Sequence, residues 1–379
     1  MISRGFPPLY AITDRKTTGV CAAENARIFV EAGIRSVQIR EKDLADGRLL
    51  RETAAAAEIA RGAGSRLFVD DRADVAKIVA CGVHLGEDDL PAADARAILG
   101  SDAAIGVSTH DGEAAARAFA DPACDYVAFG PVFATPVKSG RPAVGLEALR
   151  RVAAGRTKPL VAIGGIALDR LESVWDAGAD AAAMIGAVNG PDAAERARRA
   201  VAIARRRFLP RKIWLVGFMG SGKTTIGRIL AGRLDLPFFD LDAEIEAASG
   251  KPVRAIFETE GEAEFRRRER AYVEGSLAIP CGVFAAGGGT FAAEANRRVI
   301  LREGVSIFLD VPFEVLVSRV PAKADRPLLG DAAQARRLLE ERLPFYRMAG
   351  LSVPLTGGET PEHSAEELLR RLEERTCVI

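Results

Sequence analysis

The sequence is poor in cysteine, histidine and tryptophan, and its charges balance. Its 379 residues include five Cys, three His and two Trp. The cysteines are scattered, odd in number and never spaced as CxxC, which excludes a disulfide framework or a zinc cluster and predicts reduced thiols in a cytoplasmic protein. Lys and Arg number 52, and so do Asp and Glu, so charge gives no reason to expect nucleic acid or an anionic membrane as a partner.

Long apolar runs are also absent. No uninterrupted run approaches the roughly 18 residues that a membrane-spanning helix needs. The first residues lack the apolar segment of a secretory signal. Hydrophobic residues nevertheless make up 48% of the chain, which is ordinary for a globular protein and, at this length, enough for two domains with large cores.

Short apolar segments alternate with alanine-rich amphipathic segments through the first half of the chain. Continuous apolar strands of this kind are typical of a parallel sheet that is buried on both faces. Eight segments fit the pattern: Leu9–Asp14, Ser36–Arg40, Arg66–Asp71, Gly82–Gly86, Ala104–Thr109, Tyr126–Gly130, Pro159–Gly165 and Ala181–Gly186. The alternation alone permits a doubly wound sheet, but the count of eight and the polar residues at the strand ends favour a (β/α)8 TIM barrel.

A change in pattern near Pro210 predicts a domain boundary. We expect residues 1–207 to form the barrel domain and residues 208–379 to form a second domain. The basic run Arg205–Arg207 before the boundary is interpreted as the solvated face of a last helix, since no aromatic residues accompany it as they do in many nucleic-acid sites.

The second domain opens with a phosphate-binding loop. Residues 217–224 read GFMGSGKT, which fits G-x-x-x-x-G-K-[ST] between an apolar strand and a helix. In such a loop the backbone amides surround the phosphates of ATP, the lysine reaches the β- and γ-phosphates, and the last hydroxyl holds Mg²⁺. The residues predicted to bind ATP here are Gly220, Ser221, Gly222, Lys223, Thr224 and Thr225.

Further strands and helices predict a three-layer α/β domain with a parallel sheet. Strands are expected at 213–216, 238–241, 282–286 and 306–311. Asp240 and Asp242 fall on the same side of an extended segment, where one carboxylate can support Mg²⁺ and the other can accept a proton from a sugar-like hydroxyl. Trp214 is expected in the core.

Four more motifs follow in order: FRRRE at 265–269, GGG at 287–289, DRPLL at 325–329 and ERLPFY at 341–346. With GFMGSGKT and DLD they resemble shikimate kinase over nearly all of residues 211–379. The resemblance implies phosphorylation of the shikimate 3-hydroxyl by ATP, with Lys223, Asp242 and Arg326 in catalytic roles. It also implies a shikimate site made of Asp242, Arg266, Gly288 and Arg342, an ATP contact from Arg326, and Mg²⁺ at Thr224 and Asp240. A kinase acting on another hydroxy acid, such as gluconate, is the alternative.

Polar side chains also gather at the carboxyl ends of the predicted barrel strands. Gln38 and Arg40 alternate to one face and Lys42 follows, which supplies an amide and two cations for a diphosphate. Carboxylates after the third and fourth strands form a hard oxygen site suited to Mg²⁺. Glycines follow strands seven and eight, the usual place for a phosphate in this fold.

This set resembles thiamine phosphate synthase over about residues 7–205, through the motifs LYAITDR, VQIREKD, GVHLGEDDLP, GVSTH, GPVFATPVK and AIGGI. The resemblance implies that hydroxymethylpyrimidine diphosphate is joined to thiazole phosphate with release of pyrophosphate. It implies diphosphate contacts from Gln38, Arg40, Lys42, Asp70, Ser108 and Lys138. It also implies thiazole phosphate contacts from Thr135, Val137, Gly165, Ile185 and Gly186, and Mg²⁺ at Asp71 and Asp89.

The sequence departs from that family's pattern at four positions: Asp70, Glu87, Val137 and Gly186. Asp70 adds a negative charge beside the diphosphate, and Arg72 is a candidate partner for it. The barrel also fits a thiazole tautomerase-like enzyme that uses His110, or a non-catalytic sensor of a phosphate metabolite. His84 is expected to be a hydrogen-bonded structural histidine. The sequence therefore predicts a cytoplasmic, bifunctional, Mg²⁺-dependent transferase acting on small molecules, and it leaves the oligomeric state open.

Overall fold

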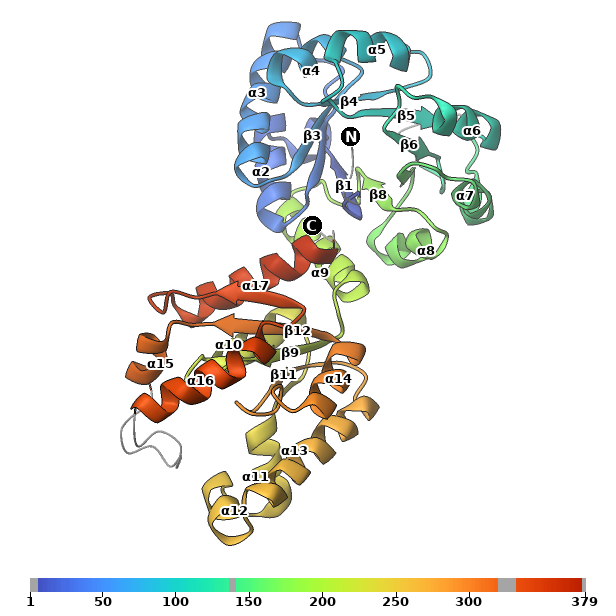
Figure 1. Ribbon diagram of the computed structural model, residues 1–379. Helices are drawn as coiled ribbons and strands as arrows, with labels where there is room; N and C mark the ends of the chain where they lie inside the picture. The colour runs from blue at the N-terminus through green and yellow to red at the C-terminus, as the bar shows by residue number, and fades with distance from the viewer. Residues whose placement is uncertain (1–5, 136–140, 320–331, 377–379) are drawn as a thin grey trace. The chain divides into compact units, whose positions relative to one another are not determined.

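The computed structural model describes residues 6–135, 141–319 and 332–376. These residues divide into two compact units, one that runs up to Phe208 and includes Thr376, and one that spans Leu209–Arg375. Each unit is an α/β fold of its own (Figure 1). Among the described residues, none of the helices combines the length and the apolar character that crossing a bilayer requires.

Eight parallel strands close the first unit into a barrel, in which each strand pairs with the next and β8 pairs with β1. The prediction of a (β/α)8 barrel is confirmed, and the alternative of a doubly wound sheet is wrong. Closure leaves no unpaired sheet edge. The strands are β1 (Leu9–Ile12), β2 (Ser36–Ile39), β3 (Arg66–Asp70), β4 (Gly82–Leu85), β5 (Ile105–Thr109), β6 (Tyr126–Phe129), β7 (Leu160–Ile163) and β8 (Ala181–Met184).

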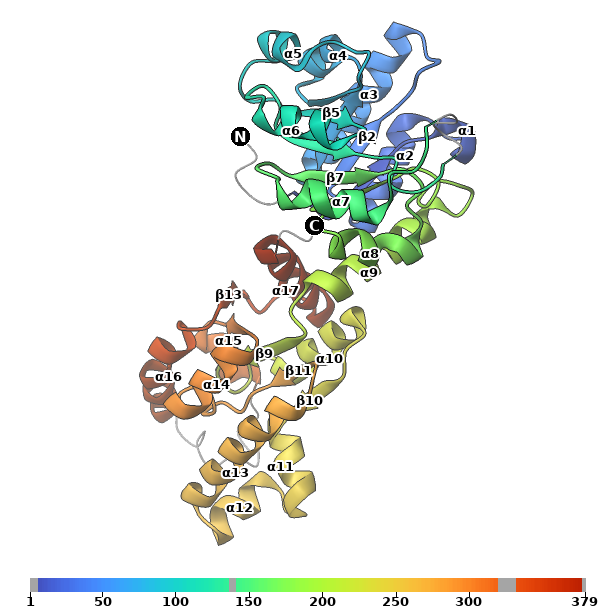
Figure 2. The same cartoon turned by 90° about the vertical axis from the view of Figure 1, so that its right-hand side faces the viewer.

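Helices cover the outside of the barrel (Figure 1, Figure 2). They are α1 (Arg15–Thr18), α2 (Ala22–Ala32), α3 (Asp46–Gly62), α4 (Ala73–Val79), α5 (Ala92–Leu99), α6 (Gly112–Ala120), α7 (Gly145–Ala154), α8 (Leu171–Asp176) and α9 (Ala193–Phe208). The basic end of α9 pairs with α8, since Arg206 lies 3.0 Å from Glu172 and Arg207 lies 3.0 Å from Asp176. These arginines form an exposed, ion-paired helix face.

Large and small side chains are matched inside the barrel. The rings of Phe6, Tyr10, Phe68 and Tyr126 are buried and lie against one another, with centroids 5.0 to 6.3 Å apart. Gly106 makes room for this cluster, because a Cβ built there would lie 2.0 Å from Cζ of Tyr126. Alanines on β6 and β8 complete the same core. The interior is therefore a packed core below an open mouth.

The second unit is built on a five-stranded parallel sheet in the order β10-β11-β9-β12-β13. Its strands are β9 (Lys212–Val216), β10 (Phe238–Asp240), β11 (Gly282–Ala285), β12 (Val305–Asp310) and β13 (Leu351–Pro354). The predicted three-layer α/β fold is confirmed, with β13 as an additional edge strand. Trp214 is buried in β9 and stacks on Phe284 with ring centroids 4.5 Å apart, so its predicted place in the core is confirmed.

Helices lie on both sides of this sheet (Figure 1, Figure 2). They are α10 (Lys223–Leu234), α11 (Leu241–Ser249), α12 (Val253–Thr259), α13 (Glu262–Gly275), α14 (Glu294–Glu303), α15 (Phe313–Arg319), α16 (Ala332–Tyr346) and α17 (Pro361–Thr376). Two of them, α12 and α14, were not predicted from the sequence. Helices α11, α12 and α13 lie together at one end of the unit in both views.

The cysteines within the described residues are free thiols. Burial raises the pKa of both Cys81 and Cys124 to about 12, so these two stay protonated at neutral pH and react poorly.

The space that Gly106 leaves for Tyr126 predicts the effect of adding one methyl group. We expect Gly106→Ala to destabilise the barrel by about 2 kcal/mol or more, because the added carbon collides with a ring in a closed core. Hydrogen exchange with mass spectrometry in rising urea measures this, since it monitors barrel peptides separately from the second unit. Gly112→Ala is the matched control, because no atom lies within 4 Å of its added carbon. Equal stability of the two variants would contradict the prediction.

Candidate active sites

A cavity of about 540 Å³ opens at the carboxyl ends of the barrel strands. It gathers side chains from strands far apart in the sequence. Eight of the predicted substrate-binding residues line it: Gln38, Arg40, Asp70, Ser108, Thr135, Gly165, Ile185 and Gly186. Two further predicted residues, Val137 and Lys138, lie outside the described residues.

Asp70 lies at the centre of a charged cluster on one wall of this cavity. Gln38 Nε2 donates to Asp70 Oδ1 at 3.1 Å, and the cations of Arg40 and Lys42 lie 3.4 and 3.7 Å from Asp70 Oδ2. Burial, followed by repulsion from Asp71, raises the pKa of Asp70 to about 6. The two cations therefore offset only part of the cost of burying this carboxylate.

Arg72 is not the partner of Asp70. Its guanidinium lies 2.5 Å from Asp46 and 2.6 Å from Asp74, at the starts of α3 and α4. The suggested pairing is wrong because Arg72 follows the turn after β3, and its side chain is held by carboxylates on the outer helices rather than at the mouth.

Asp71 and Asp89 form a carboxylate pair beside this cluster. Asp71 adopts a left-handed backbone conformation, with φ of 63°, that a non-glycine residue rarely takes. Lys42 Nζ lies 2.8 Å from Asp71, and the backbone amide of Gly86 donates to Asp89 Oδ2 at 2.6 Å. The predicted metal residues are therefore brought together next to the predicted diphosphate residues.

The pKa values of these two carboxyl groups shift in opposite directions. Burial raises the pKa of Asp89, and the adjacent Asp71 raises it further. Burial acts in the same direction on Asp71, but hydrogen bonds from Asp89 and Lys42 leave its pKa below the usual value. Two neighbouring carboxyl groups are a suitable oxygen pair for Mg²⁺, whose charge would offset their mutual repulsion. The described residues contain no group of three or more such ligands, so substrate oxygens and water would complete the coordination shell.

Glycines shape the opposite wall of the cavity. Gly164 and Gly165 have φ of 98° and 64°, and a Cβ on Gly165 would lie 2.5 Å from the carbonyl oxygen of Ala134. Gly186 faces open space, with no atom within 4 Å of a Cβ built there. This wall therefore exposes backbone where a phosphate group fits.

Arginines of α9 also reach this wall, and they were not predicted from the sequence. Arg196 donates to Asp192 at 2.7 Å and to the carbonyl of Gly186 at 3.3 Å, and both Arg196 and Arg199 line the cavity. Their spacing of three residues on the helix after β8 was the available signal, since it places both side chains on one helix face.

The two barrel histidines differ in their surroundings. His84 is buried and uses both ring nitrogens, with Nε2 at 2.9 Å from Ser108 Oγ and Nδ1 at 3.0 Å from the hydroxyl of Tyr126. The prediction of a hydrogen-bonded histidine at this position is confirmed. His110 lines the cavity with its Nδ1 2.5 Å from the carbonyl oxygen of Gly130.

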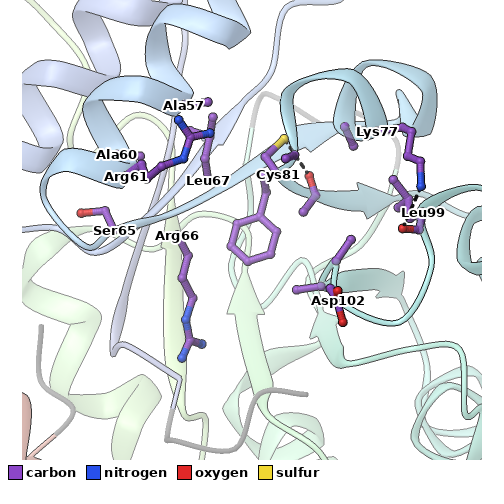
Figure 3. Close-up of a pocket in the computed structure, with 16 residues that line it drawn as sticks. Ala57, Ala60, Arg61, Ser65, Arg66, Leu67, Lys77, Cys81, Leu99 and Asp102 are labelled. Atoms are coloured by element: carbon purple, nitrogen blue, oxygen red, sulfur yellow. Dashed lines mark hydrogen bonds between the residues drawn. The ribbon is translucent and has the colours of Figure 1, made fainter.

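A second cavity of about 670 Å³ lies at the amino ends of β3 and β4 (Figure 3). None of the predicted site residues lines it. Lys77 Nζ donates to the carbonyl of Leu99 at 3.3 Å, and Arg61 donates to the carbonyl of Val79 at 3.5 Å. These two cationic groups therefore bind backbone carbonyls at helix ends, whereas the guanidinium of Arg66 lies over the ring of Phe6. The cavity lies at the opposite end of the barrel from the charged mouth.

In the second unit the phosphate-binding loop adopts the expected shape. Gly217, Gly220 and Gly222 have φ between 79° and 145°, which favours glycine. Lys223 Nζ donates to the carbonyls of Gly217 and Phe218 at 2.9 Å each, so the ammonium lies over its own loop. The predicted ATP-binding residues Gly220, Ser221, Gly222, Lys223, Thr224 and Thr225 all belong to this loop and the first turn of α10.

The predicted metal residues of this unit touch each other. Thr224 Oγ1 donates to Asp240 Oδ2 at 2.6 Å. Asp240 also caps α11, where its Oδ1 accepts from the backbone amide of Asp242 at 3.1 Å. A hydroxyl and a carboxylate next to a phosphate loop fit the oxygen preference of Mg²⁺.

The predicted acceptor residues converge on the glycines at 287–289. A Cβ on Gly287 would lie 2.9 Å from Asp242 Oδ1, one on Gly289 would lie 2.5 Å from Arg266, and one on Gly288 would lie 3.5 Å from Arg342. The carboxylate and both arginines therefore surround one small space whose floor is bare backbone. Arg326 lies outside the described residues.

Glu269 holds this arrangement and was not predicted as a site residue. It is 1% exposed, lies 2.6 Å from Arg266 and accepts from Thr290 Oγ1 at 2.7 Å. The final residue of the FRRRE motif was the available signal, because a carboxylate three residues after an arginine shares its helix face. Tyr346 adds a second support by donating to the carbonyl of Gly288.

Fold and sites together define a phosphate-binding (β/α)8 barrel joined to a P-loop kinase. The family described as thiamine monophosphate synthase matches residues 9–188, and the family described as shikimate kinase matches residues 219–373. A thiamine-phosphate synthase from Acidothermus cellulolyticus is 46% identical over 44% of this chain and 80% of its own length. A shikimate kinase from Ruegeria pomeroyi is 44% identical over 45% of this chain and 89% of its own length. The chain thus belongs to the thiamine-phosphate synthase family through its first half and to the shikimate kinase family through its second.

Two of the similar solved structures carry corresponding names. A thiamine phosphate pyrophosphorylase from Pyrococcus furiosus is 33% identical and covers 51% of this chain and 93% of its own, with a TM-score of 0.47. A shikimate kinase from Acinetobacter baumannii in complex with shikimate is 35% identical and covers 45% of this chain and 98% of its own, with a TM-score of 0.43.

The burial of Asp70 predicts that removing its charge stabilises the barrel and that the size of this stabilisation depends on pH. Because its pKa rises from 3.8 to about 6 on folding, the wild-type chain loses stability as pH increases from about 4 to 6. Asp70→Asn removes that loss. We therefore expect the variant's gain in free energy of unfolding over the wild type to be larger at pH 7.5 than at pH 4, by on the order of 2 kcal/mol. Urea unfolding at both values, followed by hydrogen exchange of barrel peptides, measures the difference.

Asp74→Asn is the matched control. The hydrogen bond from Arg72 lowers the pKa of Asp74, so the stability that this carboxylate contributes is lost only below about pH 4, and its variant should differ from the wild type by nearly the same amount at pH 4 and pH 7.5. A stability difference for Asp70→Asn that is the same at both pH values would refute the role assigned to burial.

Proposed function

We propose that the chain is a bifunctional transferase with two independent sites. Residues 1–207 couple hydroxymethylpyrimidine diphosphate to thiazole phosphate and release pyrophosphate. Residues 208–379 transfer the terminal phosphoryl group of ATP to the 3-hydroxyl of shikimate. The barrel mouth supports the first activity because the Lys42–Asp71–Asp89 cluster adjoins the cavity that eight predicted residues line. The convergence of Asp242, Arg266 and Arg342 on bare glycine backbone supports the second.

In the barrel, the diphosphate belongs on the wall formed by Gln38, Arg40 and Lys42, and Lys138 is assigned to it as well. Bond cleavage leaves negative charge on the departing pyrophosphate, and the two cations on this wall neutralise it. Asp71 and Asp89 would hold Mg²⁺, which would supply further charge neutralisation. The electron-rich aminopyrimidine bears the resulting cation, so no protein nucleophile is needed.

The thiazole phosphate belongs on the opposite wall. Gly165 and Gly186 expose backbone amides there, and Thr135 and Ile185 border the same space. Val137 is assigned to the same phosphate. The cavity then holds the thiazole nitrogen against the pyrimidine carbon, and this orientation supplies much of the catalysis.

The tautomerase-like alternative for the barrel is not favoured. A tautomerase needs no diphosphate-binding wall, whereas the Lys42–Asp71–Asp89 cluster is suited to one. The sensor alternative is tested by turnover itself. We place the enzyme in the cytoplasm, since its described cysteines are free thiols.

The assignment of Mg²⁺ to Asp71 and Asp89 predicts that removing both carboxylates strongly reduces thiamine phosphate synthesis. We expect the double variant Asp71→Ala, Asp89→Ala to lose at least a hundredfold in kcat/KM for thiamine phosphate formation, because both oxygen ligands disappear. Thiamine phosphate is measured by fluorescence after oxidation, with the full-length chain and Mg²⁺.

Asp88→Ala is the matched control, because Asp88 is exposed and adjacent to the pair. It should keep its activity, and both proteins should phosphorylate shikimate normally. A double variant that retained a third of the wild-type rate would refute this metal assignment. A wild-type chain that phosphorylates shikimate but makes no thiamine phosphate would refute the synthase assignment.

In the kinase unit, the loop at 217–224 holds the phosphates and Lys223 reaches from it toward them. Asp242 accepts the proton of the shikimate hydroxyl as the new bond to phosphorus forms. Arg266 and Arg342 bind the shikimate carboxylate, a task suited to the planar guanidinium. Thr224 and Asp240 would hold Mg²⁺, which would supply charge neutralisation on the phosphates. Arg326 is assigned to the same phosphates.

Neighbouring arginines on α13 allow a matched test of the acceptor site. Arg266→Lys should raise the KM for shikimate at least tenfold, because lysine cannot bind both a carboxylate and the buried Glu269 with a planar fork. Arg267→Lys should change it less than twofold, because Arg267 is 69% exposed and pairs with Glu264. Coupled measurement of ADP formation gives both values.

The same assay tests the alternative acceptor. Gluconate in place of shikimate should lower kcat/KM at least a hundredfold. Comparable rates with gluconate, or equal effects of the two lysine substitutions, would contradict the assignment of this site to shikimate.

A further inference from the structure

Four hydrogen-bonding side chains form a row from the closed core of the barrel to its mouth. The hydroxyls of Tyr10 and Tyr126 lie 2.9 Å apart, and the Tyr126 hydroxyl lies 3.0 Å from His84 Nδ1. His84 Nε2 in turn lies 2.9 Å from Oγ of Ser108, which lines the cavity. The four residues belong to β1, β6, β4 and β5, and we refer to them as the relay.

The buried end of the relay determines which group donates in each of its hydrogen bonds. Burial raises the pKa of Tyr10 and of Tyr126, so both hydroxyls keep their protons. Among the described residues, the Tyr10 hydroxyl has a single hydrogen-bond partner, the hydroxyl of Tyr126. Tyr10 must therefore donate to Tyr126, because a buried O–H with no acceptor is costly.

The remaining protons follow from this first one. Tyr126 accepts from Tyr10, so its own proton goes to Nδ1 of His84, which has to be unprotonated. Neutral His84 then carries its proton on Nε2 and donates it to Ser108 Oγ. The hydroxyl proton of Ser108 is left free to point into the cavity.

We propose that His84, oriented by Tyr126 and Tyr10, is a positioning residue that presents the Ser108 hydroxyl as a hydrogen-bond donor to the diphosphate substrate. This inference rests on the proposed synthase activity of the barrel. The opposite tautomer of His84 would accept the Ser108 proton and turn the oxygen lone pairs toward the diphosphate, which repels them. Each donor in the row also polarises the next, which strengthens the last bond to an anion.

The relay is not explained by packing. The rings of Phe6 and Phe68 fill the same core without any polar atom, and phenylalanine at positions 10 and 126 would fill the same volume. Burying two hydroxyls and an imidazole has a desolvation cost that their mutual hydrogen bonds offset only in part. A function at the open end of the row accounts for that cost.

The tautomer of His84 in the unmodified chain is the direct test. The full-length chain has three histidines, so a ¹⁵N-labelled sample gives a simple long-range ¹H–¹⁵N spectrum, and His84→Gln assigns the His84 signals. We expect neutral His84 with its proton on Nε2 at pH 7.5. A proton on Nδ1, or on both nitrogens, overturns the proposal.

Kinetics test whether the relay acts through Ser108. Tyr126→Phe should raise the KM for the pyrimidine diphosphate about tenfold and change kcat less than threefold, because it releases the constraint on the His84 tautomer. Tyr10→Phe with Tyr126→Phe should do the same without leaving the Tyr10 hydroxyl unpaired. In a Ser108→Ala background, Tyr126→Phe should have no further effect. Tyr272→Phe in the other unit is the control.

The possible results distinguish a failure of the relay proposal from a failure of the proposed synthase activity. If the wild type makes thiamine phosphate and both tyrosine variants keep its KM for the pyrimidine diphosphate, the relay proposal is wrong and the synthase assignment stands. Effects of Tyr126→Phe and Ser108→Ala that simply add also overturn it, since they indicate a structural role. A wild-type chain that makes no thiamine phosphate refutes the proposed function, and the substrate role of the relay falls with it.

Discussion

Both sites depend on the parallel alignment of β-strands. When neighbouring strands run in the same direction, their carboxyl ends meet at one edge, and the loops that follow them share one space. In the barrel this brings Gln38, Asp70 and Ser108 to a single mouth although they are widely separated in the chain. In the second unit it places Asp240, the last residue of β10, against Thr224, which follows β9. The chemistry differs between the units, but the geometric reason for the assembly of each site is the same.

Charge balance is the second constraint on the barrel mouth. A site that binds two phosphorylated molecules needs cations, and those cations need partners when no substrate is present. Asp70 and Asp71 provide them, since Lys42 lies within 4 Å of both. The second unit uses the same device, where Glu269 holds Arg266 from within the core. In both sites a buried or half-buried carboxylate orients the cation that is assigned to the substrate.

The sequence predicted the elements and residues whose signal is local. All eight barrel strands were located within about two residues, because each is a continuous apolar run followed by a polar turn. Strand β13 and helix α14 were missed, since the first is a short, half-exposed edge strand and the second is rich in charge. The described motif residues lie together at the two candidate sites, whereas Glu269, Arg196 and Tyr126 were missed. Glu269 and Arg196 had a local signal in their helix spacing that was not used. The role of Tyr126 arises from contacts between distant strands, which no local pattern reveals.

The departure at Asp70 illustrates how a site tolerates a residue that opposes its ligand. Asp70, with a pKa of about 6, needs little free energy to take up a proton near neutral pH. A diphosphate that approaches Arg40 and Lys42 raises that pKa further, because it competes for the same cations and repels the ionised carboxylate. If Asp70 takes up a proton when the proposed diphosphate binds, it becomes a hydrogen-bond donor to that diphosphate. The electrostatic penalty expected from the sequence is therefore reduced to the cost of one protonation, which is small close to neutral pH.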